Sequence, residues 1–93
     1  MTLFELTKMN RAKMNIESKK IVKQMFADKG IDRCESCGST NWLTIAHRKK
    51  RRHYNTVEGL SDWNENILLC LGEHMLIEQS PELTRRMFEK LRP

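Results

Sequence analysis

Apolar residues recur at helical spacing in the first third of the chain. They form one stripe between residues 15 and 30, and the lysines of that segment lie off it. The stripe consists of Ile21, Val22, Met25 and Phe26. This period indicates an amphipathic helix, and Gly30 follows where a left-handed C-terminal cap is commonly needed. Residues 1–14 show less pattern, and they either pack on the domain or form a short arm.

Two short runs of strand-forming residues follow. Residues 42–46 read Trp-Leu-Thr-Ile-Ala, and residues 66–69 form a second apolar run that ends at Cys70. Both runs predict strands of a hairpin-like scaffold. The segment from residue 47 to residue 65 is charged and poor in periodicity, so we expect a long projecting loop there.

The end of the chain predicts two helices. Leu71 to Gln79 can form the first. Ser80 and Pro81 supply an N-cap and a first-turn proline for the second, at residues 80–93. The apolar face of that last helix carries Leu83, Met87, Phe88 and Leu91. The order of elements predicts an α+β fold.

Composition limits how such a fold can be stabilised. The chain has 93 residues, of which 39% are apolar and 6% aromatic, so a bound metal would be a natural supplement to a small core. Its three cysteines cannot all close into intramolecular disulfides, and no secretory leader opens the chain, so we expect reduced thiols in the cytoplasm. No apolar run approaches the ~18 residues that cross a bilayer, which argues against a membrane role.

The cysteine spacing is typical of a structural zinc site. Cys34 and Cys37 form a C-x2-C turn that lets two thiolates bind one tetrahedral ion, and Cys70 can supply a third. The fourth ligand stays open between Glu73 and His74, because either can face the same side of a helix as Cys70. A thioredoxin-like pair would need a βαβ pattern, and a c-type haem site a histidine directly after the second cysteine; the sequence has neither.

Positive charge is concentrated at one place. The chain contains seventeen Lys and Arg and twelve Asp and Glu, for a net charge of +5. Five of the basic residues are consecutive, at positions 48–52. A dense basic run is the usual footprint of a protein that contacts phosphates. We expect nucleic-acid contacts from Arg48, Lys49, Lys50, Arg51, Arg52 and His53. A solvated loop is the plainer alternative, and in a eukaryotic cell the run could be a nuclear-import signal.

The order of these parts resembles the HNH endonuclease motif, the ββα-metal fold. The resemblance covers residues 34–79: the C-x2-C knuckle, a strand ending Ile-Ala-His47, a loop, then Asn-Ile-Leu-Leu-Cys70 and His74. It implies a small zinc-stapled domain like the free-standing HNH proteins of phages. The organisation it predicts is a single domain, 1–93, with an arm at 1–14, an N-terminal helix at 15–30, an HNH-like zinc ββα core at 31–79 and a C-terminal helix at 80–93.

The resemblance also implies roles for single residues. His47 is the candidate general base on water, Asn66 or Asn64 the asparagine that orients the strand and loop, and His74 a ligand of a catalytic divalent cation such as Mg²⁺. Glu78 lies four residues after His74 and could share that cation.

Three positions depart from the pattern that the family usually shows. Ala46 precedes His47 where many members carry a metal ligand, Glu73 replaces the fourth zinc cysteine, and Glu65 occupies the usual place of the asparagine. If zinc recruits His74 as its fourth ligand, the catalytic cation loses its best anchor.

These residues predict two functions of different classes. The first is a metal-dependent HNH-type DNA endonuclease or nickase. The alternative is a catalytically inactive HNH-like zinc module that binds nucleic acid or a protein partner as a regulator. A third interpretation is a phage or mobile-element factor that acts on a host or packaging complex. In each case we expect a bacterial or phage-infected cell.

Overall fold

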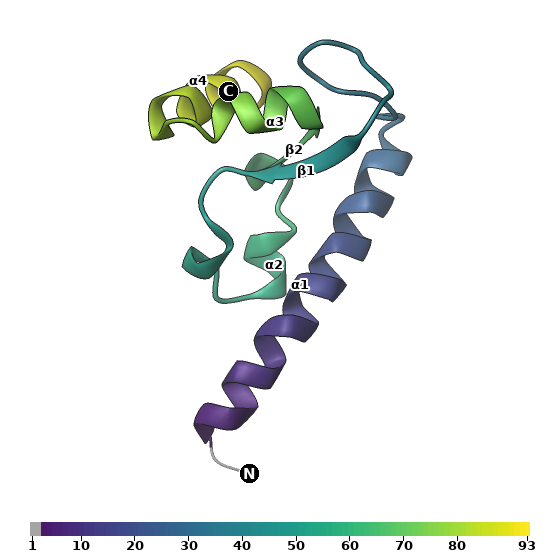
Figure 1. Ribbon diagram of the computed structural model, residues 1–93. Coiled ribbons are helices and arrows are strands. Elements are labelled where there is room, and N and C mark those ends of the chain that lie inside the picture. The colour runs from purple at the N-terminus through teal and green to yellow at the C-terminus, as the bar shows by residue number, and fades with distance from the viewer. Residues whose placement is uncertain (1–2) are drawn as a thin grey trace.

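The structure is a computed structural model that describes the backbone of residues 3–93 and the side chains of residues 11–93. Its elements are α1 (Leu3–Asp28), β1 (Leu43–His47), η1 (Arg51–His53), α2 (Val57–Leu60), η2 (Trp63–Glu65), β2 (Asn66–Cys70), α3 (Leu71–Ile77) and α4 (Pro81–Leu91). The described residues thus form a small α+β fold, as predicted, with four α-helices and a two-stranded antiparallel sheet. The hairpin lies between α1 on one side and the α3–α4 pair on the other (Figure 1).

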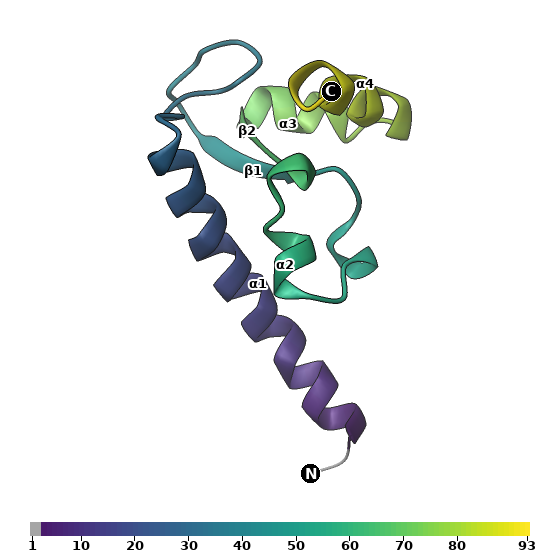
Figure 2. The ribbon, with the colours of Figure 1, turned by 180° about the vertical axis from the view of Figure 1, so that it is seen from behind.

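The first helix is longer than the sequence pattern predicts. α1 begins at Leu3, so the expected start at residue 15 was wrong, and the arm is helical over all of its described residues. The segment contains no proline or glycine and is rich in good helix formers, but its apolar stripe begins only where the helix meets the body of the protein. The first turns of α1 project beyond that body (Figure 2).

The end of α1 matches the expectation. Gly30 has a φ of 72°, and the Ile31 N–H donates to the Phe26 carbonyl at 2.8 Å. This left-handed turn closes the helix by satisfying a carbonyl that the last turn leaves free.

The hairpin sets the positions of the chemistry-bearing residues. β1 and β2 pair antiparallel, with Leu43 opposite Cys70 at one end and His47 opposite Asn66 at the other. Each strand lies within one residue of the predicted range. One face of the sheet forms the core with α3 and α4, and its buried members include Ala46, Ile67, Leu69, Ile77 and Phe88.

The segment between the strands is more ordered than predicted. It connects the two strands but contains η1, α2 and η2, short helices that the expectation of a long projecting loop did not include. Thr56 caps α2 by accepting from the Gly59 N–H at 3.0 Å, and Asp62 caps η2 by accepting from the Asn64 N–H at 2.7 Å. Such local caps stabilise single turns without any apolar periodicity.

The C-terminal helices begin where the sequence places them. α3 starts at Leu71, and the Ser80 hydroxyl caps α4 by accepting from the Leu83 N–H at 3.2 Å. None of the helices in the described part of the chain combines the length and the apolarity needed to span a bilayer.

A buried ion pair joins the end of the chain to the cysteine knuckle. Two nitrogens of Arg92 lie 2.8 and 3.0 Å from the two carboxylate oxygens of Glu35, and a third donates to the Trp63 carbonyl at 2.9 Å. The guanidinium also stacks on Trp63, 3.4 Å from the ring centroid. Glu35 in turn accepts from the Leu68 N–H at 2.7 Å. This set of bonds, the Arg92 clamp, connects α4, the knuckle, η2 and β2.

We expect Arg92→Met to lower the free energy of unfolding by about 3 kcal/mol, because it leaves the Glu35 carboxylate nearly buried without its cation. Urea denaturation of the zinc-loaded protein measures this. The matched control is Arg86→Met, whose pair with Glu82 is exposed and contributes less than about 1 kcal/mol. Equal losses of unfolding free energy in the two variants would show that the Arg92 clamp stabilises the fold no more than an exposed ion pair does.

Candidate metal centre and cleft

The three cysteines converge on one point. Their sulfur atoms all lie within 4.8 Å of one another, with Cys37 Sγ and Cys70 Sγ 3.6 Å apart. Gly38, with a φ of 79°, turns the knuckle, and its N–H donates to the Cys34 carbonyl at 2.9 Å. These three residues, which we call the cysteine cluster, are close enough to bind a metal ion, as the spacing predicted.

The donor set of the cysteine cluster fits zinc. Thiolates are preferred zinc ligands, and metal binding requires the deprotonated form. Burial raises the pKa of the Cys34 thiol, but hydrogen bonds from surrounding backbone N–H groups outweigh burial and leave that pKa below its ordinary value. At Cys37 a backbone N–H of Ser39 lowers the pKa, but the neighbouring thiols outweigh it and raise that pKa. Of these two cysteines, Cys34 therefore loses its proton more readily and is the better placed to bind a metal as the thiolate.

The two candidates for the fourth ligand stand apart from the cluster. Neither Glu73 nor His74 belongs to the group of ligand atoms within 4.8 Å. Both ring nitrogens of His74 have other neighbours: Nδ1 lies 2.7 Å from Thr44 Oγ1, and Nε2 lies 3.0 Å from Glu78 Oε1. Among the described residues the cluster thus offers three candidate ligands, and His74 remains available for other chemistry.

The hydrogen bonds around Thr44 define which nitrogen of His74 carries a proton. The Thr44 hydroxyl donates its single hydrogen to the Leu69 carbonyl at 2.9 Å. Its oxygen must then accept from His74 Nδ1–H, so in the neutral form of the ring the lone pair would be on Nε2. Nε2 lies against the Glu78 carboxylate at 3.0 Å, so a proton on Nε2 or a cation bound by both groups would join them.

His47 and Asn66 meet at the other end of the hairpin. Asn66 is fully buried, and its Nδ2 donates to the carbonyls of Leu60 and Asp62, both at 2.8 Å. It thereby holds the end of α2 against the start of β2, directly opposite His47 on β1. Of the two asparagines that the sequence left open, Asn64 is exposed and contributes its carbonyl to a bond from Arg48 at 3.1 Å.

The environment of His47 keeps its imidazole neutral. Burial is the largest cause, and the positive charge of Arg51 acts in the same direction. A hydrogen bond with the backbone of Leu60 opposes them, and together they lower the pKa to about 4. At neutral pH the ring therefore carries one proton and one free lone pair, the form that a general base requires.

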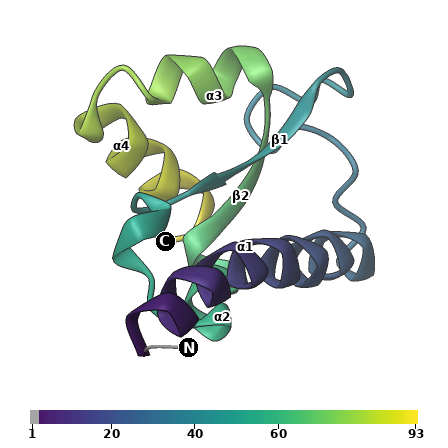
Figure 3. The same cartoon turned by 60° about the horizontal axis from the view of Figure 1, so that its bottom comes forward.

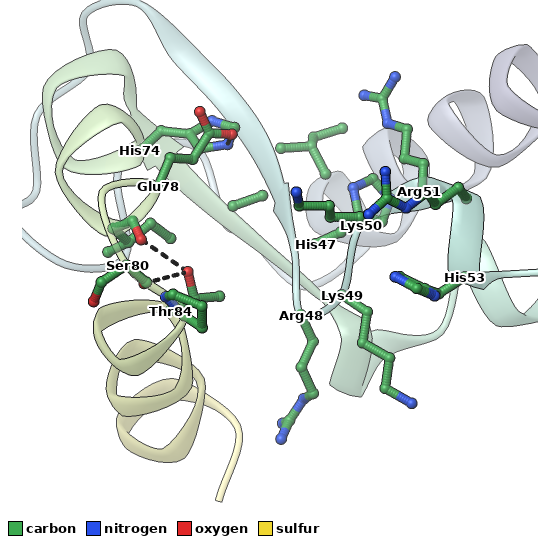
Figure 4. Close-up of a pocket in the computed structure, with 15 residues that line it drawn as sticks. His47, Arg48, Lys49, Lys50, Arg51, His53, His74, Glu78, Ser80 and Thr84 are labelled. Atoms are coloured by element: carbon green, nitrogen blue, oxygen red, sulfur yellow. Dashed lines mark hydrogen bonds and ion pairs between the residues drawn. The ribbon is translucent and has the colours of Figure 1, made fainter.

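Both histidines line one cleft of about 890 Å³. The helices α3 and α4 border it on one side and the segment after β1 on the other (Figure 4). Its lining includes the whole predicted basic group: Arg48, Lys49, Lys50, Arg51, Arg52 and His53. Five of these six side chains are exposed.

Arg48 is the exception in the basic group. Its guanidinium forms an ion pair with Glu65 at 3.2 Å, donates to the Arg92 carbonyl at 3.1 Å and packs over the Phe88 ring. The predicted role of Arg48 in contacting nucleic acid therefore competes with a structural one, because this side chain anchors the segment to the core.

Several residues of the site had no signal in the sequence. The Tyr54 hydroxyl accepts from the Lys49 N–H at 3.0 Å and donates to Glu65 at 2.9 Å, and Arg11 of α1 donates to the carbonyls of Arg51 and Tyr54 at 3.1 and 3.0 Å. These bonds fix the backbone of the basic run. The Arg11 bonds join residues 40 and 43 positions apart in the chain, so no local spacing could have indicated them.

Comparison with known proteins returns no matching family model, no matching curated protein and no matching solved structure. The function must therefore be argued from the residues and their geometry.

We expect the purified protein to contain one zinc ion per chain. We expect the Cys34→Ser variant to contain much less than one, because a two-thiolate site binds zinc far more weakly. Elemental analysis of the gel-filtered protein measures the metal content. Thr40→Ala, an exposed change in the same turn region, should retain the zinc. A strong chelator should also lower the melting temperature of the wild type, and an unchanged melting temperature would argue against a structural metal.

We expect the pKa of His47 to be about 4 in a titration of its ring resonances by NMR. Since this folded-state pKa lies below that of an unfolded histidine, the group contributes to stability fully above pH ~6.5, and the contribution is lost as the pH falls toward 4. Arg51→Gln should move the pKa upward, because it removes a positive charge beside the ring. Arg52→Gln is the matched control, and an equal shift in both variants would contradict the assignment to Arg51.

Proposed function

We propose that the protein is a metal-dependent DNA endonuclease or nickase of the HNH type. The observation that carries this proposal is the convergence, on one cleft, of a neutral histidine, a histidine–carboxylate pair and a run of exposed cations. Phosphodiester hydrolysis needs these three things: a base for water, ligands for a divalent cation and positive charge for the backbone.

His47 is the proposed general base. Its hydrogen bond with the Leu60 backbone engages one ring nitrogen, and the other has a free lone pair at neutral pH. That nitrogen would take a proton from water as the water oxygen attacks the phosphorus. Asn66 acts as a positioning residue, because the Leu60 carbonyl that it binds belongs to the same backbone that orients His47.

His74 and Glu78 are the proposed ligands of the catalytic cation. His74 Nε2 and Glu78 Oε1 lie 3.0 Å apart, close enough for the lone pair of a neutral imidazole and the carboxylate to bind one cation. When bound, a divalent cation such as Mg²⁺ would stabilise charge on the phosphate and on the leaving oxygen. The Thr44 hydroxyl fixes the ring in the tautomer that this requires.

The exposed cations are the proposed grip on the DNA backbone. Lys49, Lys50, Arg51 and Arg52 form no ion pair with any residue whose side chain the structure describes. Contacts of this kind carry little sequence information, so weak sequence preference and steep salt dependence follow.

The alternative is a regulator that binds nucleic acid through the same basic run, holds zinc in the cysteine cluster and does not cleave. One observation favours it. Ala46 is fully buried at the place where the resemblance would put a further metal ligand, so His74 and Glu78 would hold the catalytic cation without a third protein ligand.

We expect the zinc-loaded wild type to nick supercoiled plasmid when Mg²⁺, Mn²⁺ or Ni²⁺ is added, and His47→Ala to lose at least about 100-fold in rate, the usual contribution of a general base. Gel electrophoresis of the plasmid measures the rate. Gln79→Ala is the control, because Gln79 is exposed and does not line the cleft. The controlled comparison excludes a co-purified nuclease, whose activity would survive both changes.

The role of Glu78 is tested in the same assay. Glu78→Gln should raise the concentration of cation needed for half-maximal nicking, while Gln79→Glu should not. If no metal supports nicking by a protein that retains its zinc, the non-catalytic alternative replaces the enzyme.

A further inference from the structure

The exposed lysines and the exposed acids of α1 lie at different angles around the helix. Its exposed lysines between residues 13 and 23 are Lys13, Lys19, Lys20 and Lys23, and its exposed acids in the described part are Glu17 and Asp28. Measured from the buried Val22 at about 100° per residue, the lysines occupy an arc of roughly 60° to 180°, and the acids lie at roughly 220° to 240°. The four lysines, which we call the lysine flank, form no ion pair with a residue whose side chain is described.

The lysine flank lies beside the basic run of the cleft. Lys19 lines a small cavity of about 10 Å³ together with His47 and Arg51, two residues that also line the main cleft. More than one turn before it, Arg11 donates to the carbonyls of Arg51 and Tyr54. α1 therefore runs past the segment that carries the cleft's cations, while α3 and α4 lie across the hairpin (Figure 3).

We propose that the lysine flank of α1 is a second contact surface for the backbone of the DNA duplex that occupies the cleft. The proposal rests on the proposed function and extends the binding surface beyond the cleft. Lys13 and Lys23 are ten residues apart, which is about 15 Å along a helix at 1.5 Å per residue. At 3.4 Å per base pair this row spans about four base-pair steps of a duplex.

The chemistry of the flank favours a duplex over other polyanions. Surfaces for single strands combine cations with aromatic side chains on which bases stack, and the flank contains no aromatic residue. Protein interfaces are depleted in lysine, whose ammonium group is strongly hydrated, and Ile16 is the one large apolar side chain exposed on this side of α1 between residues 13 and 23. A band of hydrated cations along one side of a helix suits a rigid, hydrated phosphate backbone.

Three charge-matched variants test the proposal in the zinc-loaded full chain. The flank variant is Lys13→Gln/Lys20→Gln/Lys23→Gln, the cleft variant is Lys49→Gln/Lys50→Gln/Arg52→Gln, and the control is Arg33→Gln/Arg86→Gln/Lys90→Gln. Each lowers the net charge from +5 to +2, since 5 − 3 = 2. All nine side chains are exposed, so thermal melts should confirm folding. Lys19 is left intact because it lines the cavity beside His47.

The measurement is the fluorescence anisotropy of a labelled duplex of about two helical turns, ~20 base pairs, over a series of salt concentrations. Each phosphate contact contributes about −0.9 to the slope of log K against log salt. We expect the flank variant to reduce the steepness of that slope by about 2 to 3, the cleft variant to do likewise, and the control to stay within about 0.5 of the wild type.

Three other outcomes would each contradict one part of the proposal. A flank variant that matches the control, beside a cleft variant that loses its slope, overturns the lysine flank and leaves the proposed function intact. A wild type without salt-dependent duplex binding overturns both. Equal flank-dependent binding to a single strand or to polyglutamate overturns the assignment to a duplex.

Discussion

The register of the β1–β2 hairpin is the constraint on which the rest of the structure depends. It places Cys70 beside the knuckle at one end and His47 opposite Asn66 at the other. Because side chains alternate between the faces of a sheet, a slip of one residue would turn His47 toward α3 and α4 and would separate it from Asn66. Ion binding at the cysteine cluster would hold β2 to the knuckle, so a metal outside the cleft could stabilise the register that builds the cleft.

The basic run is held through its backbone, which leaves its charges free. Arg11 and Tyr54 bond to backbone groups of the run, and Asn66 bonds to the carbonyls that follow it. Among partners whose side chains or backbone the structure describes, Arg48 is the one member of the run that binds through its guanidinium, and the Arg92 carbonyl accepts one of its bonds. Clustered like charges repel one another, so a fold that fixes their backbone without neutralising them retains a positive surface at some cost in stability.

Local patterns predicted the elements better than the contacts between them. The C-x2-C turn, the Ser80–Pro81 cap and the two strand runs are short-range signals, and the structure contains the elements that each predicts. The start of α1 was missed because helix propensity continues where the apolar stripe is absent. The Arg92 clamp and the Thr44–His74 bond join residues far apart in the chain, so their partners could be found only after the chain had folded.

The Thr44 hydroxyl determines whether His74 can serve the cysteine cluster or the proposed catalytic cation. A histidine that served zinc would need a ring nitrogen directed at the cysteines, but Thr44 receives Nδ1–H and Glu78 faces Nε2. The hairpin carries Thr44, and its hydroxyl in turn bonds to the Leu69 carbonyl of the partner strand, so the ring is oriented by the sheet itself. A metal at the cysteine cluster and the proposed catalytic cation therefore need not compete for His74. Whether the cysteine cluster finds a fourth ligand does not determine whether the cleft can bind its cation.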